Sequence, residues 1–396
     1  MQRSLARTAV LLSQTVSVPA RRRVWQQARA LRQAGWRVRV LCPREKGQPK
    51  RETIEGIEIE RFAQPFEGNG KASILIEYLL ALANLTARLV ATRLRGRIDV
   101  VQVANPPDWV VIPALLLRPF GSRVVFDMAD LSTVLFEAKF GRGSLLLPVI
   151  GSLGRLALKL PDLVITANET YRRIALAWGR RSPGETIAIH SYPERLPLPR
   201  ARAPGPLRIG YFGVLGSHDG VDRLIEAVAR VRGEALELVI VGDGPALPAL
   251  RRLAKRAGDL NVRFAGFLSG EAREAAIASF DIAVIPDPVN RYTRSISMNK
   301  AYIYAAHGLP IVSTPLRETK RLLPCALFAA GDRPAQLAEC LQHLLGDAAL
   351  RQSLGKAARA RAEAAFDWGL ESGRYVAALN ALAPRIACPA KAVAAA

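Results

Sequence analysis

The stretch DIAVIPDPVNRYTRSISMNKAYIYAAHGLPIVST, residues 281–314, decides the fold of this chain. Its first residues form a short β-branched run that predicts a buried strand, and a polar loop containing Asp287 follows. A helix is expected to begin near residues 297–300, and the Gly308–Pro310 turn leads into a second strand. Orphan N–H groups at the start of such a helix favour an anion. The stretch therefore predicts a strand–loop–helix–strand unit of a parallel sheet, with a candidate anion site at the loop.

The same alternation of short apolar runs and helical stretches continues along the chain in both directions. In the first half, we expect strands at 8–12, 37–42, 100–103, 124–127 and 163–166, with a helix at 24–34. In the second half, we expect strands at 207–212, 236–241, 262–264, 282–285 and 311–313, and helices at 221–231, 246–256, 272–279 and 299–306. Strands that alternate with helices predict parallel sheets in doubly wound α/β domains.

A proline-rich stretch without periodicity, RLPLPRARAPGP, separates the two halves and predicts a linker. We therefore expect an N-terminal Rossmann-like domain at 1–195, a linker at 196–206, a C-terminal Rossmann-like domain at 207–375 and a tail at 376–396. Ligands bind beyond the carboxyl ends of the strands in such domains. We expect the two domains to face each other across a cleft that holds the ligands.

The net charge of +22 is concentrated in the first half, where 31 Lys and Arg face 16 Asp and Glu in residues 1–200, against 25 and 18 in residues 201–396. Nucleic acid, an anionic membrane surface or a phosphorylated substrate would each explain this excess, as would a compositional bias toward arginine. No basic stretch is interleaved with aromatic residues, so we expect no nucleic acid partner. The stretches 73–94 and 145–160 are amphipathic, and each either packs on its own sheet or lies on a membrane surface.

The four cysteines, Cys42, Cys325, Cys340 and Cys388, are scattered without the spacing of metal ligands. This usage favours a reducing, cytoplasmic compartment, and the sequence contains neither a convincing secretory signal nor 18 uninterrupted apolar residues. We expect a cytoplasmic protein, and a peripheral position on the inner face of the plasma membrane stays open.

Two glycine-containing turns follow expected strands in the second half. The first, in YFGVLGSHDGVDRLIEAV at 211–228, places Gly213 directly after the strand, where a glycine lets backbone approach a phosphate. The second, VGDGP at 241–245, contains Asp243, which is either a ligand contact or a turn or helix-cap residue. Each turn alone is a weak signal, because such turns occur in many α/β proteins.

The order of these motifs resembles a known family. GVLGSHDGVD, VGDGP, FAGF, DIAVIPDP and SMNKAYIYAAHGLPIV resemble the nucleotide-sugar domain of the retaining glycosyltransferases of family 4, which have the GT-B fold. In the first half, RRVWQQARAL, NPPD, FDMADL, FEAKFG and ITANETYRRIAL resemble one branch of that family. The resemblance extends from about residue 7 to about residue 380.

The resemblance implies transfer of a sugar from a nucleoside-diphosphate sugar to a lipid-linked or saccharide acceptor, with retention and without an essential metal or other cofactor. Cell-surface polysaccharide or glycolipid synthesis would be the setting. The leaving diphosphate would be stabilised by backbone amides and basic side chains. The implied donor-binding residues are Gly213, Gly242, Asp243, Gly244, Arg294, Ser297, Asn299 and Lys300, and Lys300 is also expected to act in catalysis.

Lys300 is the most informative of these residues. A lysine at a helix N-terminus is disfavoured by the helix dipole, and a bound phosphate would relieve the conflict. The alternative is a lysine on a solvated helix end.

The chain departs from the family pattern at several positions of the second half. Ser295 and Ile303 stand where the family has a Glu-x7-Glu pair, whose second member binds the ribose, and isoleucine offers no hydrogen-bond acceptor to a hydroxyl. Val214 and Asp219 stand where an Arg and a Lys are often found, and Arg291 and Arg294 are candidates to replace that pair.

In the first half, the branch usually has Asp-His-His-Asp where this chain has Asp127–Met128–Ala129–Asp130, so we expect no histidine from the first domain in the site. Asp127 or Asp130 is expected to act in catalysis by orienting the acceptor hydroxyl, with Asp108 in support; Glu137 and Lys139 are further candidates. For each carboxylate, a helix cap or a salt bridge is the alternative. Two functions stay open: an active transferase, or a non-catalytic partner subunit of such a pathway.

Overall fold

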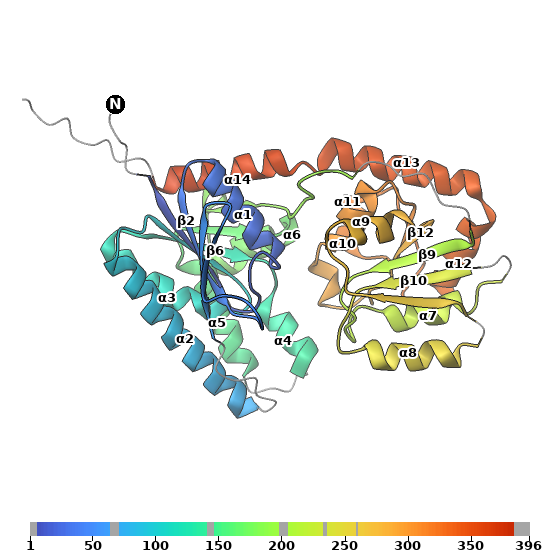
Figure 1. Ribbon diagram of the computed structural model, residues 1–396, viewed down its shortest axis with the longest axis horizontal. Coiled ribbons are helices and arrows are strands. Elements are labelled where there is room, and N and C mark those ends of the chain that lie inside the picture. The colour runs from blue at the N-terminus through green and yellow to red at the C-terminus, as the bar shows by residue number, and fades with distance from the viewer. Residues whose placement is uncertain are drawn as a thin grey trace, which may run out of the picture. The chain divides into compact units, whose positions relative to one another are not determined.

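The computed structural model divides into two compact units: a first unit of Met1–His190 with Gly369–Ala396, and a second unit of Ser191–Trp368. The structure describes residues 6–63, 71–140, 146–197, 205–232, 236–258 and 260–383, and of residues 71–78 and 138–140 it describes the backbone alone. Figure 1 labels the helices and strands of both units.

The first unit is built on an eight-stranded sheet of order β3-β4-β2-β1-β5-β6-β7-β8. Its strand pairs are parallel apart from the antiparallel pair β3–β4. The central strands β1, β5, β6 and β7 are buried along nearly their whole length because helices cover both faces of such a sheet. The strands are β1 Thr8–Ser13, β2 Arg37–Pro43, β3 Arg51–Ile54, β4 Ile57–Phe62, β5 Val100–Ala104, β6 Arg123–Met128, β7 Leu163–Thr166 and β8 Thr186–Ala188.

Strands β3 and β4 form a hairpin that the sequence analysis did not predict. Its two-residue turn, Glu55–Gly56, has positive φ at both positions (51° and 74°), as the tightest hairpin turns require. The hairpin extends the sheet at one edge, beyond β2. The alternation of apolar and charged residues in IEIERF is the pattern of a half-buried strand, so the sequence did carry a signal for this hairpin.

The helices of the first unit connect its strands and cover its sheet (Figure 1). They are α1 Arg22–Gln33, α2 Lys71–Leu94, α3 Val111–Leu115, α4 Ser132–Phe140, α5 Leu147–Lys159, α6 Glu169–Gly179 and α14 Trp368–Leu382, with short 3₁₀ turns η1 Asp108–Val110, η2 Arg118–Phe120 and η3 Pro183–Glu185. Among the described residues, no helix is both long and apolar enough to cross a membrane.

The last helix, α14, belongs to the first unit, although the sequence analysis placed residues up to 375 in the second domain. Its Tyr375 is fully buried and donates a hydrogen bond from its hydroxyl to Gln102 Oε1 of β5 at 2.7 Å. Asn380 Oδ1 accepts a hydrogen bond from Trp36 Nε1 at 3.1 Å. These contacts with distant parts of the sequence, which local periodicity cannot reveal, correct the expected boundary.

The second unit is built on a six-stranded, wholly parallel sheet of order β11-β10-β9-β12-β13-β14. Its strands are β9 Leu207–Phe212, β10 Leu236–Val241, β11 Val262–Gly266, β12 Ile282–Ile285, β13 Ile311–Ser313 and β14 Leu327–Phe328. Its helices are α7 Val221–Val228, α8 Leu247–Arg256, α9 Gly270–Ala278, α10 Asn299–Ala306, α11 Arg317–Leu322, α12 Pro334–Gly346 and α13 Ala348–Ala365, with the 3₁₀ turn η4 Thr293–Ser295.

Two apolar layers enclose this sheet. Helices α7, α8 and α12 pack on one face, and α9, α10, α11 and α13 pack on the other (Figure 1). Neighbouring residues of one strand enter opposite layers, as Val284 and Ile285 of β12 do, because side chains alternate across a strand.

The expected strand–helix alternation is confirmed in both halves. The strands expected at 163–166, 207–212, 236–241, 282–285 and 311–313 have the expected bounds, as does helix α10. Residues 198–204 of the expected linker and residues 384–396 of the expected tail, including Cys388, lie outside the described residues.

Candidate functional site

Asp127, near the carboxyl end of β6, is fully buried and held by two side chains of α1. Arg23 Nε donates to both carboxylate oxygens, at 3.1 Å to Oδ1 and 3.0 Å to Oδ2, and Arg23 Nη2 lies 2.7 Å from Oδ1. Gln27 Nε2 donates to Oδ2 at 3.0 Å. Both oxygens are thus engaged within the unit, so the structure places Asp127 in a buried ion pair, the alternative that the sequence analysis left open.

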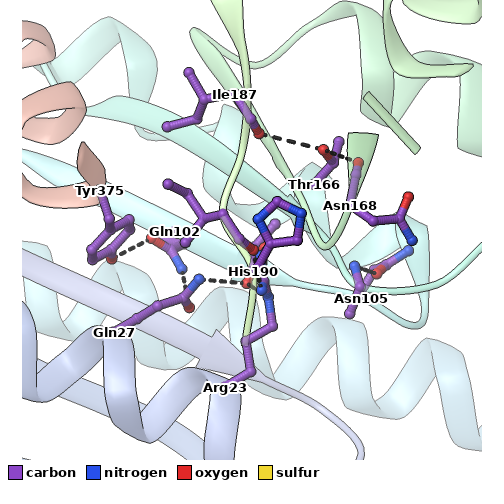
Figure 2. A network of polar contacts seen from close by, with 12 residues as sticks. Arg23, Gln27, Gln102, Asn105, Thr166, Asn168, Ile187, His190 and Tyr375 are labelled. Carbon is purple, nitrogen blue, oxygen red and sulfur yellow. Dashed lines mark hydrogen bonds and ion pairs between the residues drawn. The ribbon is translucent and has the colours of Figure 1, made fainter. Parts of the chain in front are cut away.

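This ion pair is one end of a chain of buried polar groups (Figure 2). Gln27 Oε1 accepts from Gln102 Nε2 at 2.8 Å, and Gln102 Oε1 accepts from the Tyr375 hydroxyl. Arg23 Nη1 donates to the carbonyl oxygen of Ile189 at 2.6 Å. Burial raises the pKa of Tyr375 well above its usual value, so this hydroxyl keeps its proton. The chain links α1, β5, β6, α14 and the segment after β8 into one rigid layer.

Asp130 follows β6 and is half-buried beside two arginines. Burial raises the pKa of Asp130, and the positive charges of Arg21 and Arg23 oppose that shift. Arg21 Nη1 donates to Ser13 Oγ and Thr15 Oγ1, at 2.9 Å each, and Nη2 donates to the carbonyl oxygen of Asn105. Arg21 therefore joins the segments that follow β1, β5 and β6.

Asn105 brings Asp108 and Asp130 together. Its Oδ1 accepts from the backbone N–H groups of Ala129 at 2.7 Å and Asp130 at 3.2 Å, and its Nδ2 donates to Asp108 Oδ1 at 2.8 Å. Ser132 Oγ donates to the same Oδ1 at 2.7 Å. Burial and the nearby Asp130 raise the pKa of Asp108, against the lowering effect of the two donors. Asn105 therefore links the Asp108 carboxylate to the backbone at Asp130.

The other first-half candidates have separate outcomes. Glu137 is half-buried on α4, and the side chain of Lys139 lies outside the described residues. The first unit contains a histidine, His190, at the end of its first stretch. Its backbone N–H donates to Glu371 Oε2 at 2.8 Å, and its Nδ1 lies 3.4 Å from the same oxygen.

The sequence analysis missed the roles of Arg21, Arg23 and Asn105. A signal was present for two of them, because Arg23 lies in RRVWQQARAL and Asn105 in NPPD, whereas Arg21 directly precedes the first of these landmarks. Nothing in their spacing showed that an arginine of the first landmark reaches an aspartate 104 residues away. Such a pairing depends on the strand order, which brings β1, β5 and β6 side by side.

In the second unit, the glycines expected to face a ligand pack against each other. Gly242 has φ of 142°, and a Cβ there would lie 1.8 Å from the carbonyl oxygen of Gly213. The Gly213 N–H donates to the Val241 carbonyl oxygen at 3.1 Å, and a Cβ on Gly244 would lie 2.6 Å from the Leu215 carbonyl oxygen. The glycines are required for the close approach of the loops after β9 and β10, and the Gly213 amide is already hydrogen-bonded.

Asp243 lies on the exposed side of this pair of loops. Its Oδ1 accepts from the Gly244 N–H at 2.7 Å, while its carbonyl oxygen accepts from Leu215 at 3.0 Å. Helix α8 has Ala246 as its N-cap. Asp243 is therefore a turn residue rather than a helix cap, and its carboxylate reaches solvent.

Lys300 is 8% exposed, so the alternative of a solvated lysine is wrong. Its Nζ donates to Asp287 Oδ2 at 2.8 Å and to the Tyr211 hydroxyl at 3.3 Å, and it lies 4.6 Å from the centre of the Tyr211 ring. Burial alone would lower the pKa of Lys300, but the adjacent Asp287 outweighs it and raises that pKa. Burial also raises the pKa of Asp287 and of Tyr211. Asp287 thus balances the charge of Lys300 at the start of α10.

The remaining donor-side candidates differ in exposure. Arg294 and Asn299 are exposed around the start of α10, and Ser297 between them is half-buried. Ile303, where the family has a ribose-binding glutamate, is 8% exposed and packs in the core layer of α10. Asp219, which replaces a basic residue of the family, accepts a hydrogen bond from the Gly216 N–H at 2.9 Å. Arg291, Arg294, Asn299 and Asp243 are therefore among the exposed polar residues at this edge.

Within the part of the chain that the structure describes, no group of three or more His, Cys, Asp and Glu side chains is arranged to hold a metal ion. Four carboxylates at the two strand edges lie beside arginine, lysine or amide groups. They are Asp127, Asp130, Asp108 and Asp287.

Both halves of the chain match glycosyltransferase family models. Residues 20–193 match the glycosyl transferase 4-like domain, and residues 206–347 match the glycosyl transferases group 1. A GDP-mannose-dependent monoacylated alpha-(1-6)-phosphatidylinositol monomannoside mannosyltransferase of Corynebacterium glutamicum is 32% identical over 162 residues, which are 39% of this chain and 42% of that protein. The chain spans about two fifths of the length of the curated relatives it matches.

Solved structures share the whole fold at low sequence identity. Sucrose-phosphate synthase of Thermosynechococcus elongatus has a TM-score of 0.76 and 18% identity, covering 93% of this chain and 97% of that one. HepE of Anabaena, solved with UDP and glucose, has a TM-score of 0.68 and 15% identity, covering 95% and 100%. The architecture is therefore the GT-B fold, as expected from the sequence.

Proposed function

Because this chain belongs to the GT-B glycosyltransferases, we propose that it transfers a sugar from a nucleoside-diphosphate sugar to a lipid-linked or saccharide acceptor. The observation that carries the proposal is that each of the two matching family models falls on one of the two parallel-sheet units. We further propose retention at the anomeric carbon and no essential metal. Cell-surface polysaccharide or glycolipid synthesis is the proposed setting.

The donor would bind at the strand edge of the second unit. The carboxyl ends of β9, β10 and β12 meet there, together with the start of α10, whose free N–H groups and dipole favour a diphosphate. The positive charge of Lys300 is paired with Asp287, so the exposed Arg294 would supply a positive charge to the diphosphate. Asn299 would donate a hydrogen bond to the diphosphate. Charge that develops on the leaving diphosphate would be stabilised by these groups. Lys300 would act as a positioning residue, by holding the Asp287 loop.

The acceptor would bind at the strand edge of the first unit. Asp130 and Asp108 are carboxylates of this edge, and neither belongs to the ion pair between Arg23 and Asp127. We assign the orientation of the acceptor hydroxyl to Asp130, and no such role to Asp127, whose two oxygens are engaged by Arg23 and Gln27.

Release of nucleoside diphosphate tests the transferase. The purified chain is mixed with membrane extract and a panel of nucleoside-diphosphate sugars, and the anomeric configuration of any product is read by NMR. We expect turnover with at least one donor, retention, and no loss on addition of a metal chelator. Turnover should fall about tenfold or more in Arg294→Ala and Asn299→Ala, because a lost hydrogen bond to a charged group costs about 1.5–3 kcal/mol. Arg252→Ala, which removes an exposed arginine of α8, is the matched control.

A non-catalytic partner subunit is the second candidate function. It is favoured by Ile303 in the core, where it offers a ribose no acceptor, and by the pairing of Lys300 with Asp287. Absence of turnover with every donor, together with no calorimetric binding of UDP or GDP, would shift the assignment to this function. Binding without turnover would keep the donor site and put the acceptor in question.

We also propose that α2 docks on an anionic membrane surface at the cytoplasmic face. The helix has a buried stripe of Ala81, Leu85 and Leu89, and a second, exposed apolar stripe on another side. The exposed stripe consists of Leu79, Leu80, Ala83, Ala87, Val90 and Leu94. A helix that is apolar on two sides and open on one of them is a contact surface.

Charge around this stripe favours a membrane over a second apolar protein. Arg95 and Arg97 are exposed just after α2, and exposed Arg118 and Phe120 of η2 lie nearby, since Arg93 Cζ of α2 is 5.9 Å from the Phe120 ring. Apolar residues beside arginines suit the boundary of an anionic bilayer. The side chains of residues 71–78, which begin the helix, lie outside the described ones.

Vesicle co-sedimentation tests the docking surface. We expect binding to vesicles with phosphatidylglycerol and much weaker binding to pure phosphatidylcholine. A variant with Val90→Ser and Leu94→Ser should bind at least about fivefold more weakly, whereas Leu370→Ser on α14, which is 64% exposed, should bind like the parent. Equal binding of all three proteins would refute the membrane contact.

A further inference from the structure

The first unit contains a cavity of about 240 Å³ beside Asp108. It lies between the segment that follows β5 and helices α4 and α5, and its walls are mainly apolar. The lining residues are Thr15, Pro106, Pro107, Asp108, Trp109, Ser132, Leu135, Phe136, Ile150 and Leu153. Its size suits one ring or a short alkyl segment rather than an oligosaccharide, since ordinary ligand pockets are about 300–1,000 Å³.

Asp108 is 8% exposed and is the carboxyl group of this cavity. Its Oδ1 is held from one side by Asn105 Nδ2 at 2.8 Å and by Ser132 Oγ at 2.7 Å. Among the described residues, no hydrogen bond is made to its Oδ2. That oxygen faces α5 at Gly154, where an added Cβ would lie 3.0 Å from it. A polar atom is thus held in a fixed direction and left for a ligand.

The chemistry of Asp108 restricts what the ligand can be. Because Oδ1 already receives two hydrogen bonds, the proton of a neutral carboxyl would sit on Oδ2 and be donated from there. Burial raises the pKa of Asp108 and so favours this neutral form. A phosphate or a polyhydroxyl group that entered the cavity would give up its hydrogen bonds to water, and the leucine, isoleucine and proline walls would not replace them. An uncharged apolar group with one acceptor oxygen loses little.

We propose that this cavity binds the apolar end of the acceptor: an uncharged alkyl or aromatic group joined to an oxygen that accepts a hydrogen bond from Asp108 Oδ2. The proposal rests on the transferase function proposed above and specifies its acceptor class, an apolar glycoside or alcohol. Asp108 is a binding residue in this account, and Gly154 is the glycine that allows α5 to approach it.

Calorimetry on the full chain tests the proposal with three probes: methyl, octyl and phenyl β-D-glucoside, the octyl compound kept below its micelle-forming concentration. We expect octyl or phenyl glucoside to bind at least about tenfold more tightly than methyl glucoside. Comparison of the octyl and phenyl compounds shows whether the cavity prefers an alkyl or an aromatic group. Equal affinity for all three glucosides would overturn the proposal.

Variants locate the binding within the cavity. Gly154→Val should abolish the advantage of the apolar probes, because its side chain fills the space at Oδ2, whereas Ser152→Val at an exposed position of the same helix should keep it. Asp108→Asn, which offers an N–H donor in the same place, should bind within about threefold of the parent, and Asp108→Ala about tenfold more weakly. Unchanged probe binding in both Gly154→Val and Asp108→Ala would overturn the assignment.

UDP and GDP titrated into the same proteins separate this proposal from the proposed function. A chain that binds octyl glucoside in the cavity but no nucleotide would support the apolar site while contradicting the transferase. A chain that binds nucleotide and turns over donor, but shows no preference for apolar glucosides, would contradict the cavity alone. Melting temperatures of all variants, measured in parallel, show whether a loss of binding comes from unfolding.

Discussion

The two strand edges of this molecule neutralise their buried charges in different ways. In the first unit, Asp127 has an arginine fork and a glutamine, and the glutamine continues into a chain of neutral hydrogen bonds. In the second unit, Asp287 is paired with one lysine, and the surrounding loops are held by close backbone packing at glycines. The first edge depends on side chains in a fixed network, whereas the second depends on the absence of side chains. The two edges should therefore fail under different substitutions.

Arg23→Ala should have the largest effect on stability. It leaves the fully buried Asp127 without its counter-charge, and loss of one partner of a buried pair costs about 3–5 kcal/mol. Urea unfolding, with hydrogen exchange of β6 to identify the unit, measures the loss. Arg32→Ala, at an exposed position of the same helix, should change stability by less than about 1 kcal/mol. Equal stabilities of the two variants would show that the network is not what holds the first edge.

Gly242→Ala tests the second edge and should cost about 2–4 kcal/mol, combining overpacking with an unfavourable positive φ. The added Cβ would lie 1.8 Å from the Gly213 carbonyl oxygen. Gly205→Ala separates the two causes, because Gly205 has almost the same φ, 143°, and nothing within 4 Å of its Cβ position. If both variants lost the same stability in thermal unfolding, the close packing of the loops would not matter.

Asp287→Asn should cost about 1–3 kcal/mol, since the amide keeps a hydrogen-bond acceptor but no charge for the buried Lys300. Adding Lys300→Met should recover part of the loss, because the unpaired buried charge is removed. A double-mutant cycle by urea unfolding measures this coupling, with Asp243→Asn as an exposed control. Strictly additive losses would mean that the pair is not coupled.

The smallest expected effect is a change of stability with pH, caused by the partly exposed Glu274 and its partner His307 in the second unit. The hydrogen bond from His307, aided by Arg273, lowers the pKa of Glu274 from 4.5 to about 2, although partial burial opposes the shift. A folded-state pKa below the unfolded value adds stability that is present above about pH 4.5 and lost as the pH falls toward 2. The loss should be about 1–2 kcal/mol, since the Glu274 side chain is 32% exposed and partly screened.

Urea midpoints of the parent and Glu274→Gln measure this contribution between pH 6 and pH 3. The difference between the two proteins should shrink as the pH falls, because the parent loses the charge that the variant never has. A difference that stays constant over this range would contradict the assignment of the pKa.

Most of the fold could be predicted from the sequence because strands that are buried on both faces appear as short, β-branched apolar runs. LVIT of β7 and IAVI of β12 were placed to the residue. The β3–β4 hairpin was missed although IEIERF alternates apolar and charged residues, because the expected strands were short, fully apolar runs, and a half-buried edge strand has none. The membership of α14 in the first unit was missed because a helix periodicity shows which face is apolar, not which sheet it meets.

The candidate site was predictable in position but not in partners. Both expected strand edges are present, and at the first of them Asn105 links the Asp108 carboxylate to the backbone of Asp130. Asp127 and Lys300 were expected to meet a substrate, yet Arg23 and Asp287 engage them. Pairing of charges depends on burial and side-chain direction, which one sequence without its fold does not determine.

Binding of nucleoside diphosphates to the full chain, measured by calorimetry, tests the central claim most directly. If the second unit is a working donor site, UDP or GDP should bind with a dissociation constant between about 1 μM and 1 mM, the ordinary range for substrates. Arg294→Ala and Asn299→Ala should weaken that binding at least about fivefold, and Arg252→Ala should not. No binding of either nucleotide by a folded protein at millimolar concentration would contradict the account.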